Sequence, residues 1–111
     1  MSKINVGRTL RLLSDTEESP IRSKQVRDCL TVAYDAYGKA RDADDPREAY
    51  RYLGSLHMLV IDAMLHMRPS AANEAVMPIL ADCLGTIAAK RVEVGHHIRA
   101  TEPEPAEGLF A

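Results

Sequence analysis

The chain has 111 residues and a mass of 12.2 kDa, which is enough for one modest core and leaves no room for a second domain. Its 14 Lys and Arg residues nearly balance its 16 Asp and Glu residues, so the surface as a whole is not that of a polyanion-binding protein. With no Trp and a single Phe, the core must be aliphatic, and aliphatic cores suit helices packed side by side.

The N-terminal part of the chain predicts a short helix followed by a long amphipathic one. Residues 4–13 place their apolar side chains near one side of a helix that we expect to dock on the rest of the fold. The polar stretch 14–19 ends in Ser19, a capping residue, and Pro20 suits the first position of a helix, so the long helix is expected to begin there. It is predicted to end near residue 43. Its apolar residues recur at intervals of three and four: Val26, Leu30, Ala33, Tyr37 and Ala40.

The second long helix is predicted over residues 46–67, with Asp45 as its cap. Apolar side chains surround nearly its whole circumference. Its few polar residues form one narrow stripe: Arg51, Ser55, Asp62 and His66. Because a helix this apolar must be covered on most sides, we expect it to be the central helix of a bundle and part of an interface as well.

The third long helix is predicted from Pro69 or Ser70 to about Val94. Pro78 lies inside it and predicts a kink or a short break, because proline removes one backbone hydrogen bond. Gly95 is expected to end the helix. Residues 99–111 are acidic and rich in proline, and we expect them to form a flexible tail.

Together these elements predict an all-α fold, in which residues 1–98 form three long helices in an up-down-up bundle with a short N-terminal helix, followed by a disordered acidic C-terminal tail. Cys29 and Cys83 fall among apolar neighbours, so we expect both to be buried and reduced. The first residues lack the apolar core of a signal peptide. The longest stretch without a charged residue, Tyr52 to Ile61, is about half of what a membrane span needs, so we expect no membrane association and a cytoplasmic location.

No catalytic, cofactor-binding or metal-binding motif stands out, and we expect no enzymatic activity, cofactor or metal. Two of the long helices are apolar on more than the one stripe that a small bundle can cover, which indicates self-association or a protein partner. The leading hypothesis is a non-enzymatic interaction protein that forms a homodimer. It would act as a regulator, namely an adaptor, inhibitor or assembly component of a bacterial or phage system. The predicted interface residues are Leu56, Met58, Leu59, Asp62, Met64, His66, Met67 and Met77.

One alternative is a ribonuclease. Arg51 precedes His57 by six residues, and Arg91 precedes His96 by five. This spacing resembles that of the HEPN ribonucleases, which are also small helical bundles and use an Arg followed four to six residues later by His. The resemblance implies RNA cleavage, with Arg51 and His57 as the active pair.

A second alternative is a nucleic-acid-binding assembly protein. Basic residues are frequent near the N-terminus, where they could contact phosphates and release counterions. The candidate contact residues are Lys3, Arg8, Arg11, Arg22, Lys24 and Arg27.

Small and large residues alternate between Ala33 and Gly54 in a way that resembles a tetratricopeptide helix pair over about twenty residues. The following stretch lacks the turn that an array of such repeats requires, so an array is excluded. We interpret the match as close antiparallel packing of the first two long helices, with Gly54 allowing the contact.

Overall fold

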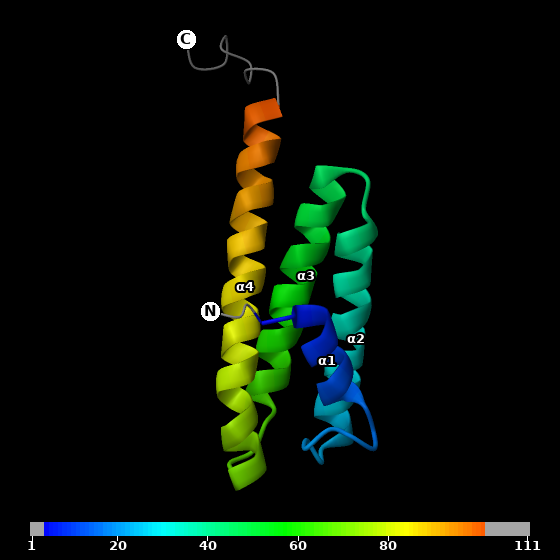
Figure 1. The fold of residues 1–111 in the computed structure, drawn as a ribbon, viewed down its shortest axis with the longest axis vertical. Helices are drawn as coiled ribbons and strands as arrows, with labels where there is room; N and C mark the ends of the chain where they lie inside the picture. The colour runs from blue at the N-terminus through cyan, green and yellow to red at the C-terminus, as the bar shows by residue number, and fades with distance from the viewer. Residues whose placement is uncertain (1–3, 102–111) are drawn as a thin grey trace.

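The computed structural model of the chain describes residues 4–101, which form four helices and no strand (Figure 1). The helices are α1 (Val6–Ser14), α2 (Lys24–Asp42), α3 (Pro46–Leu65) and α4 (Ala71–Thr101). In Figure 1, α2 runs up, α3 runs down beside it and α4 runs up again, with the short α1 lying against the lower half of the bundle. The predicted all-α fold of three long helices preceded by a short one is therefore confirmed. The predicted acidic tail lies outside the described residues, except for residues 99–101, which continue α4.

Side-chain caps fix where the helices begin. Asp45 caps α3 as predicted, because its Oδ1 accepts a hydrogen bond of 2.9 Å from the amide two residues later. The predicted start of the first long helix at Pro20 is wrong. Ser19 instead closes a local turn with the amide two residues later, at 3.0 Å. The hydroxyl of Ser23 accepts from the amide three residues later, at 3.3 Å, so α2 begins at Lys24.

α4 is longer than its sequence predicts. It runs through Pro78 without a break, although proline leaves the carbonyl of Glu74 without its helical partner. Pro78 and Glu74 are both exposed residues. Gly95 does not end the helix, since no glycine of the described chain adopts the left-handed conformation of a C-terminal cap. Instead Gly95 allows close packing, because a Cβ there would lie 3.1 Å from Cε1 of Tyr50.

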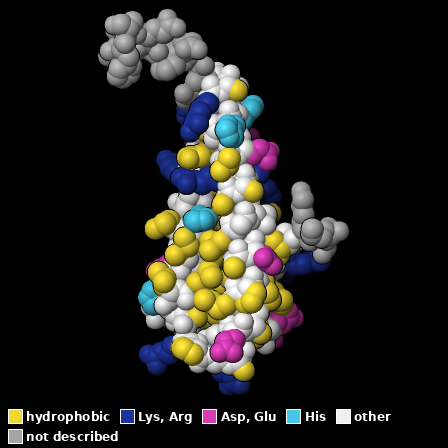
Figure 2. Space-filling view, turned by 90° about the vertical axis from the view of Figure 1, so that its left-hand side faces the viewer, with side chains coloured by type: hydrophobic (Ala, Val, Ile, Leu, Met, Phe, Trp, Pro, Cys, Tyr) yellow, Lys and Arg dark blue, Asp and Glu magenta, His cyan; other side chains and the backbone are white. Residues whose placement is uncertain are grey.

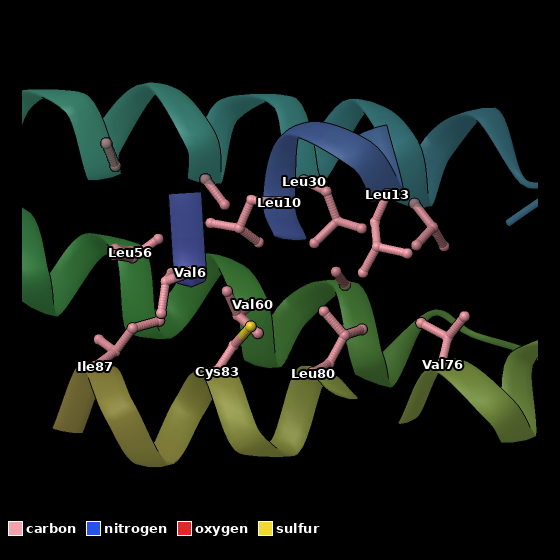
Figure 3. Close-up of a cluster of buried hydrophobic side chains, with 14 of the residues drawn as sticks. Val6, Leu10, Leu13, Leu30, Leu56, Val60, Val76, Leu80, Cys83 and Ile87 are labelled. Carbon is pink, nitrogen blue, oxygen red and sulfur yellow. The ribbon is translucent and has the colours of Figure 1, made fainter. Parts of the chain in front are cut away.

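α3 is the central helix, as predicted, with α2 on one side and α4 on the other. Within residues 4–101, the backbones of α2 and α4 do not approach each other closely, and the backbone of α1 lies mainly beside α2 and approaches α4 at few positions. The core is aliphatic and draws on all four helices (Figure 3). Its labelled members are Val6, Leu10, Leu13, Leu30, Leu56, Val60, Val76, Leu80, Cys83 and Ile87.

Both cysteines are free, but only one is fully buried. Cys83 lies in the core, where burial raises the pKa of its thiol to about 11. Cys29 is half-buried and donates to the backbone carbonyl of Leu59 across the α2 and α3 interface, at 3.2 Å. Burial, and then the nearby Asp62 carboxylate, raise the pKa of Cys29 as well. Both groups are therefore neutral, unreactive thiols near neutral pH.

Candidate functional site

α4 carries more apolar surface than its neighbours cover. Between Ala71 and Ala89 its only charged residues are Glu74 and Asp82. A helix that is apolar around most of its circumference is normally buried on most sides. α4 nevertheless packs on α3 alone, apart from a marginal contact with α1. One uncharged stripe follows its outer side at intervals of three and four residues: Pro78, Ala81, Gly85, Ala88 and Val92.

A ridge of α3 continues this apolar surface. Met58 and Leu65 are 66% and 77% exposed, the two highest values among the large hydrophobic residues of the described chain, and the half-buried Ile61 lies between them. Since α3 and α4 are antiparallel and Arg91 reaches Gly54, the ridge runs alongside the α4 stripe. We call the α3 ridge and the α4 stripe together the apolar face. Figure 2 shows hydrophobic side chains gathered on the lower and middle part of this side of the molecule.

The predicted interface residues differ in how far they are exposed. Met58 lies on the apolar face, whereas Met64, Met67 and Met77 are half-buried, and the first two pack against the core. Leu56 was wrongly placed at the interface, because its exposed fraction is 0% and it belongs to the core-facing side of α3. Leu59, also predicted, packs against the core on the side that faces α2, where its carbonyl receives the Cys29 thiol.

Leu65 is the interface candidate that the sequence analysis missed. The core-facing residues of α3 are spaced by three, four and three: Leu53, Leu56, Val60 and Ala63. Leu65 lies nine residues beyond Leu56, a rotation of about 900°, or half a turn from it. If the core-facing side of α3 had been known, the spacing of its buried residues would have shown that Leu65 faces outward.

Asp62 and His66, predicted at the interface, make contacts within the chain. His66 ends α3, and its Nδ1 lies 2.8 Å from the backbone carbonyl oxygen of Asp62 and 3.6 Å from that residue's Oδ1. The other carboxylate oxygen of Asp62 lies 3.8 Å from Sγ of Cys29. Asp62 is exposed and lies four residues after Met58 and three before Leu65, so its carboxylate borders the ridge on the side facing α2.

A second feature lies at the upper end of the same side. Arg91 extends from α4 across α3, and its guanidinium carbon lies 4.4 Å from the centroid of the Tyr50 ring. A Cβ at Gly54 would lie 3.2 Å from Nη2 of Arg91, so a larger residue there would displace the guanidinium by a few tenths of an ångström. Gly54 thus allows contact with α4, and not with α2 as its sequence context suggested. Nε of Arg91 is buried and has no hydrogen-bond partner within residues 4–101.

Arg91 borders an open cleft of about 660 Å³. The cleft is lined by Gly54, Ser55, His57, Met58, Leu59 and Arg91. Arg51 is not among these residues. Its guanidinium lies over the Tyr52 ring, with the guanidinium carbon 5.3 Å from the ring centroid. Six helical positions rotate a side chain by about 600°, so Arg51 and His57 point in different directions from α3. The structure therefore brings His57 together with Arg91 and not with Arg51.

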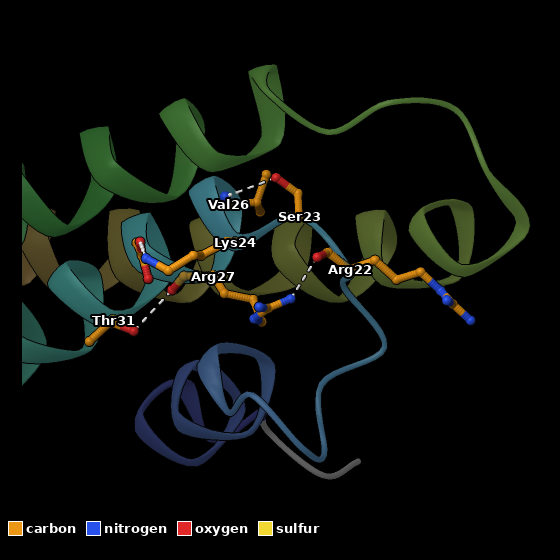
Figure 4. Close-up of polar contacts among 7 residues, drawn as sticks. Arg22, Ser23, Lys24, Val26, Arg27 and Thr31 are labelled. Atoms are coloured by element: carbon orange, nitrogen blue, oxygen red, sulfur yellow. Dashed lines mark hydrogen bonds and ion pairs between the residues drawn. The ribbon is translucent and has the colours of Figure 1, made fainter.

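Several of the N-terminal basic residues already have partners (Figure 4). Nη1 of Arg27 donates to the carbonyls of Ile21 and Arg22 at 2.9 and 2.7 Å, which ties down the loop before α2. Lys24 pairs with Asp28 at 2.8 Å. Arg8, Arg11 and Arg22 are exposed, and Lys3 lies outside the described residues.

Comparison of the chain with protein-family models, with curated proteins and with solved structures found no match. Within the described residues, no group of three or more His, Cys, Asp or Glu side chains is placed to hold a metal ion. None of the four helices combines the length and the apolar character needed to cross a membrane.

Proposed function

We propose that this protein is a non-enzymatic interaction module that self-associates through the apolar face. The observation that carries the proposal is the exposure of Met58 and Leu65 beside the uncharged stripe of α4. Single exposed apolar residues are common on protein surfaces and need no explanation. A group of exposed apolar residues on two adjacent helices is instead typical of an interaction site.

A second copy of the chain is the occupant that this surface fits best. A two-fold interface must be complementary to itself. The α4 stripe meets that requirement. It is uncharged, and its two ends, Pro78 and Val92, lie seven residues on either side of Gly85, so two antiparallel copies that cross at Gly85 match end to end. Two α4 helices that cross in antiparallel fashion at Gly85 would approach closely, since this glycine has open space around it. Met58 and Leu65 of each copy would then cover the α4 helix of the other.

The proposed cellular role follows from this surface. A small chain whose apolar surface exceeds what its own core uses suits an adaptor, an inhibitor or an assembly component. Two free thiols favour a reducing compartment such as the cytoplasm. A bacterial or phage setting is part of the proposal and rests on the small size of the chain alone.

The molar mass in solution tests the proposal. Light scattering coupled to size-exclusion chromatography should give twice the chain mass for the wild type and one chain mass for a variant carrying both Met58→Glu and Leu65→Glu. Val32→Glu is the matched control, because Val32 is 54% exposed on α2, away from the apolar face. A monomeric wild type, or a double variant that stays dimeric, would refute self-association through this face.

A further inference from the structure

We infer that the cleft beside Arg91 binds a phosphate group, with Arg91 and His57 as its donors. This inference does not rest on the proposed self-association. The cleft borders the apolar face and shares only Met58 with it. It is supported by the unpaired charge of Arg91, by the rigid placement of its guanidinium and by the kinds of donor that share the cleft.

The charge of Arg91 has no carboxylate partner among residues 4–101. Other cations of the described chain do pair with carboxylates: Lys24, Lys39, Arg41 and Lys90. Arg91 is half-buried, its Nε is fully enclosed, and none of its five N–H donors makes a hydrogen bond within the described chain. Leaving a partly desolvated cation unpaired costs free energy that a bound anion would recover.

The guanidinium is held in place without using its donors. The Tyr50 ring covers one side of the group, and the backbone of Gly54 lies close to it. Stacking of this kind orients the planar group while leaving its terminal N–H groups available. An anion that binds there pays little of the entropy cost of ordering a long side chain.

The set of donors favours phosphate over carboxylate. Arg91 contributes a guanidinium from α4, and His57 contributes an imidazole from α3. A tetrahedral phosphate offers oxygens in several directions, whereas both oxygens of a carboxylate lie in one plane. The cleft has no acidic lining residue to repel an anion.

The surroundings of the cleft are also basic. Arg51 on α3 and Arg99 on α4 are exposed, and neither has a carboxylate partner within the part of the chain that is described. Figure 2 shows Lys and Arg side chains gathered above the hydrophobic part of this side of the molecule. Such a cluster raises the local concentration of anions and would extend contact along a phosphate backbone.

Binding measurements on the full-length protein test this site. The ligands are inorganic phosphate, a nucleoside monophosphate and a fluorescent single-stranded RNA, followed by calorimetry for the first two and by fluorescence anisotropy for the third. Arg91→Gln should weaken binding at least about tenfold, which corresponds to about 1.4 kcal/mol. Arg8→Gln is the matched control, because it removes an exposed arginine far from the cleft.

If Arg91→Gln does not fold, Gly54→Ala provides a second test of the site. Gly54→Ala retains the arginine but displaces the guanidinium by a few tenths of an ångström, so binding should weaken while the charge is unchanged. RNA binding much tighter than that of the nucleotide would identify a nucleic-acid strand as the source of the phosphate, and equal affinities would identify a small phosphate compound. No binding of any of the three ligands, equal loss in Arg8→Gln, or equally tight binding of polyglutamate would overturn the phosphate site.

Discussion

Replacement of Gly7 by Ala tests how α1 packs on the bundle. Gly7 is buried, and a Cβ added there would lie 2.6 Å from Cε2 and 3.0 Å from Cζ of Tyr37, so the ring would have to move. Overpacking of this kind costs about 1–3 kcal/mol. The better helix propensity of alanine offsets at most about 1 kcal/mol of that cost. We therefore expect Gly7→Ala to lower the free energy of unfolding by about 1 kcal/mol.

Gly38→Ala is the matched control. This substitution is chemically identical and lies inside α2, where the nearest atom to the added Cβ is the flexible Nη2 of Arg41 at 4.0 Å. Here the helix propensity acts alone and should raise the free energy of unfolding by about 0.5–1 kcal/mol. The two variants should therefore differ by about 2 kcal/mol, or roughly 8 °C in Tm.

Urea and thermal unfolding followed by far-ultraviolet circular dichroism measure this difference at one protein concentration, because association would make stability depend on concentration. Tyr37→Ala removes the ring, so the cost of Gly7→Ala should vanish in that background. If Gly7→Ala stabilised the protein as much as Gly38→Ala, or if its cost persisted without the ring, the described contact between α1 and α2 would be incorrect.

Three further predictions concern other parts of the chain. Burial raises the pKa of the Cys83 thiol from 9.0 to about 11. The contribution of the neutral thiol to stability is therefore fully present below pH 9 and is lost as the pH rises to 11. The free energy of unfolding should fall more steeply over that range in the wild type than in Cys83→Ala, and parallel curves would contradict this. Asp45→Ala should lower the free energy of unfolding by about 1 kcal/mol through loss of the α3 cap, whereas Asp44→Ala, an equal charge change next to it, should have little effect in the same urea titration. Because Arg51 and His57 point in different directions, wild type and His57→Ala should show the same RNA cleavage, and loss of cleavage in His57→Ala would restore the ribonuclease hypothesis.

The helices could be predicted because their signals are local. Periodic apolar residues and the proline positions located all three long helices, and the Asp45 cap was read correctly. The start of α2 could not be read in this way, because Ser19 and Ser23 are both good caps. The choice depends on Ile21, which is buried in the core and holds the segment before α2 in a non-helical conformation.

The candidate sites depend on tertiary contacts that the sequence does not specify. Leu56 and Leu65 are the same residue type on the same helix, and only the packing of α3 makes one a core residue and the other an exposed one. The contact between Arg91 and Tyr50 joins residues about forty positions apart, and it requires the antiparallel register of α3 and α4. No spacing within one helix indicates such a pair.

Oxidative cross-linking at Gly85 tests self-association through the apolar face most directly. If two copies cross at this residue, Gly85→Cys should form a covalent dimer that non-reducing electrophoresis detects, because two cysteines on the axis would come within disulfide range. Gly38→Cys, on α2, should not, and it carries the same native cysteines as an internal control. Covalent dimers from Gly85→Cys alone are the result that our account predicts. The absence of dimers from Gly85→Cys, or equal dimer formation by both variants, would contradict it.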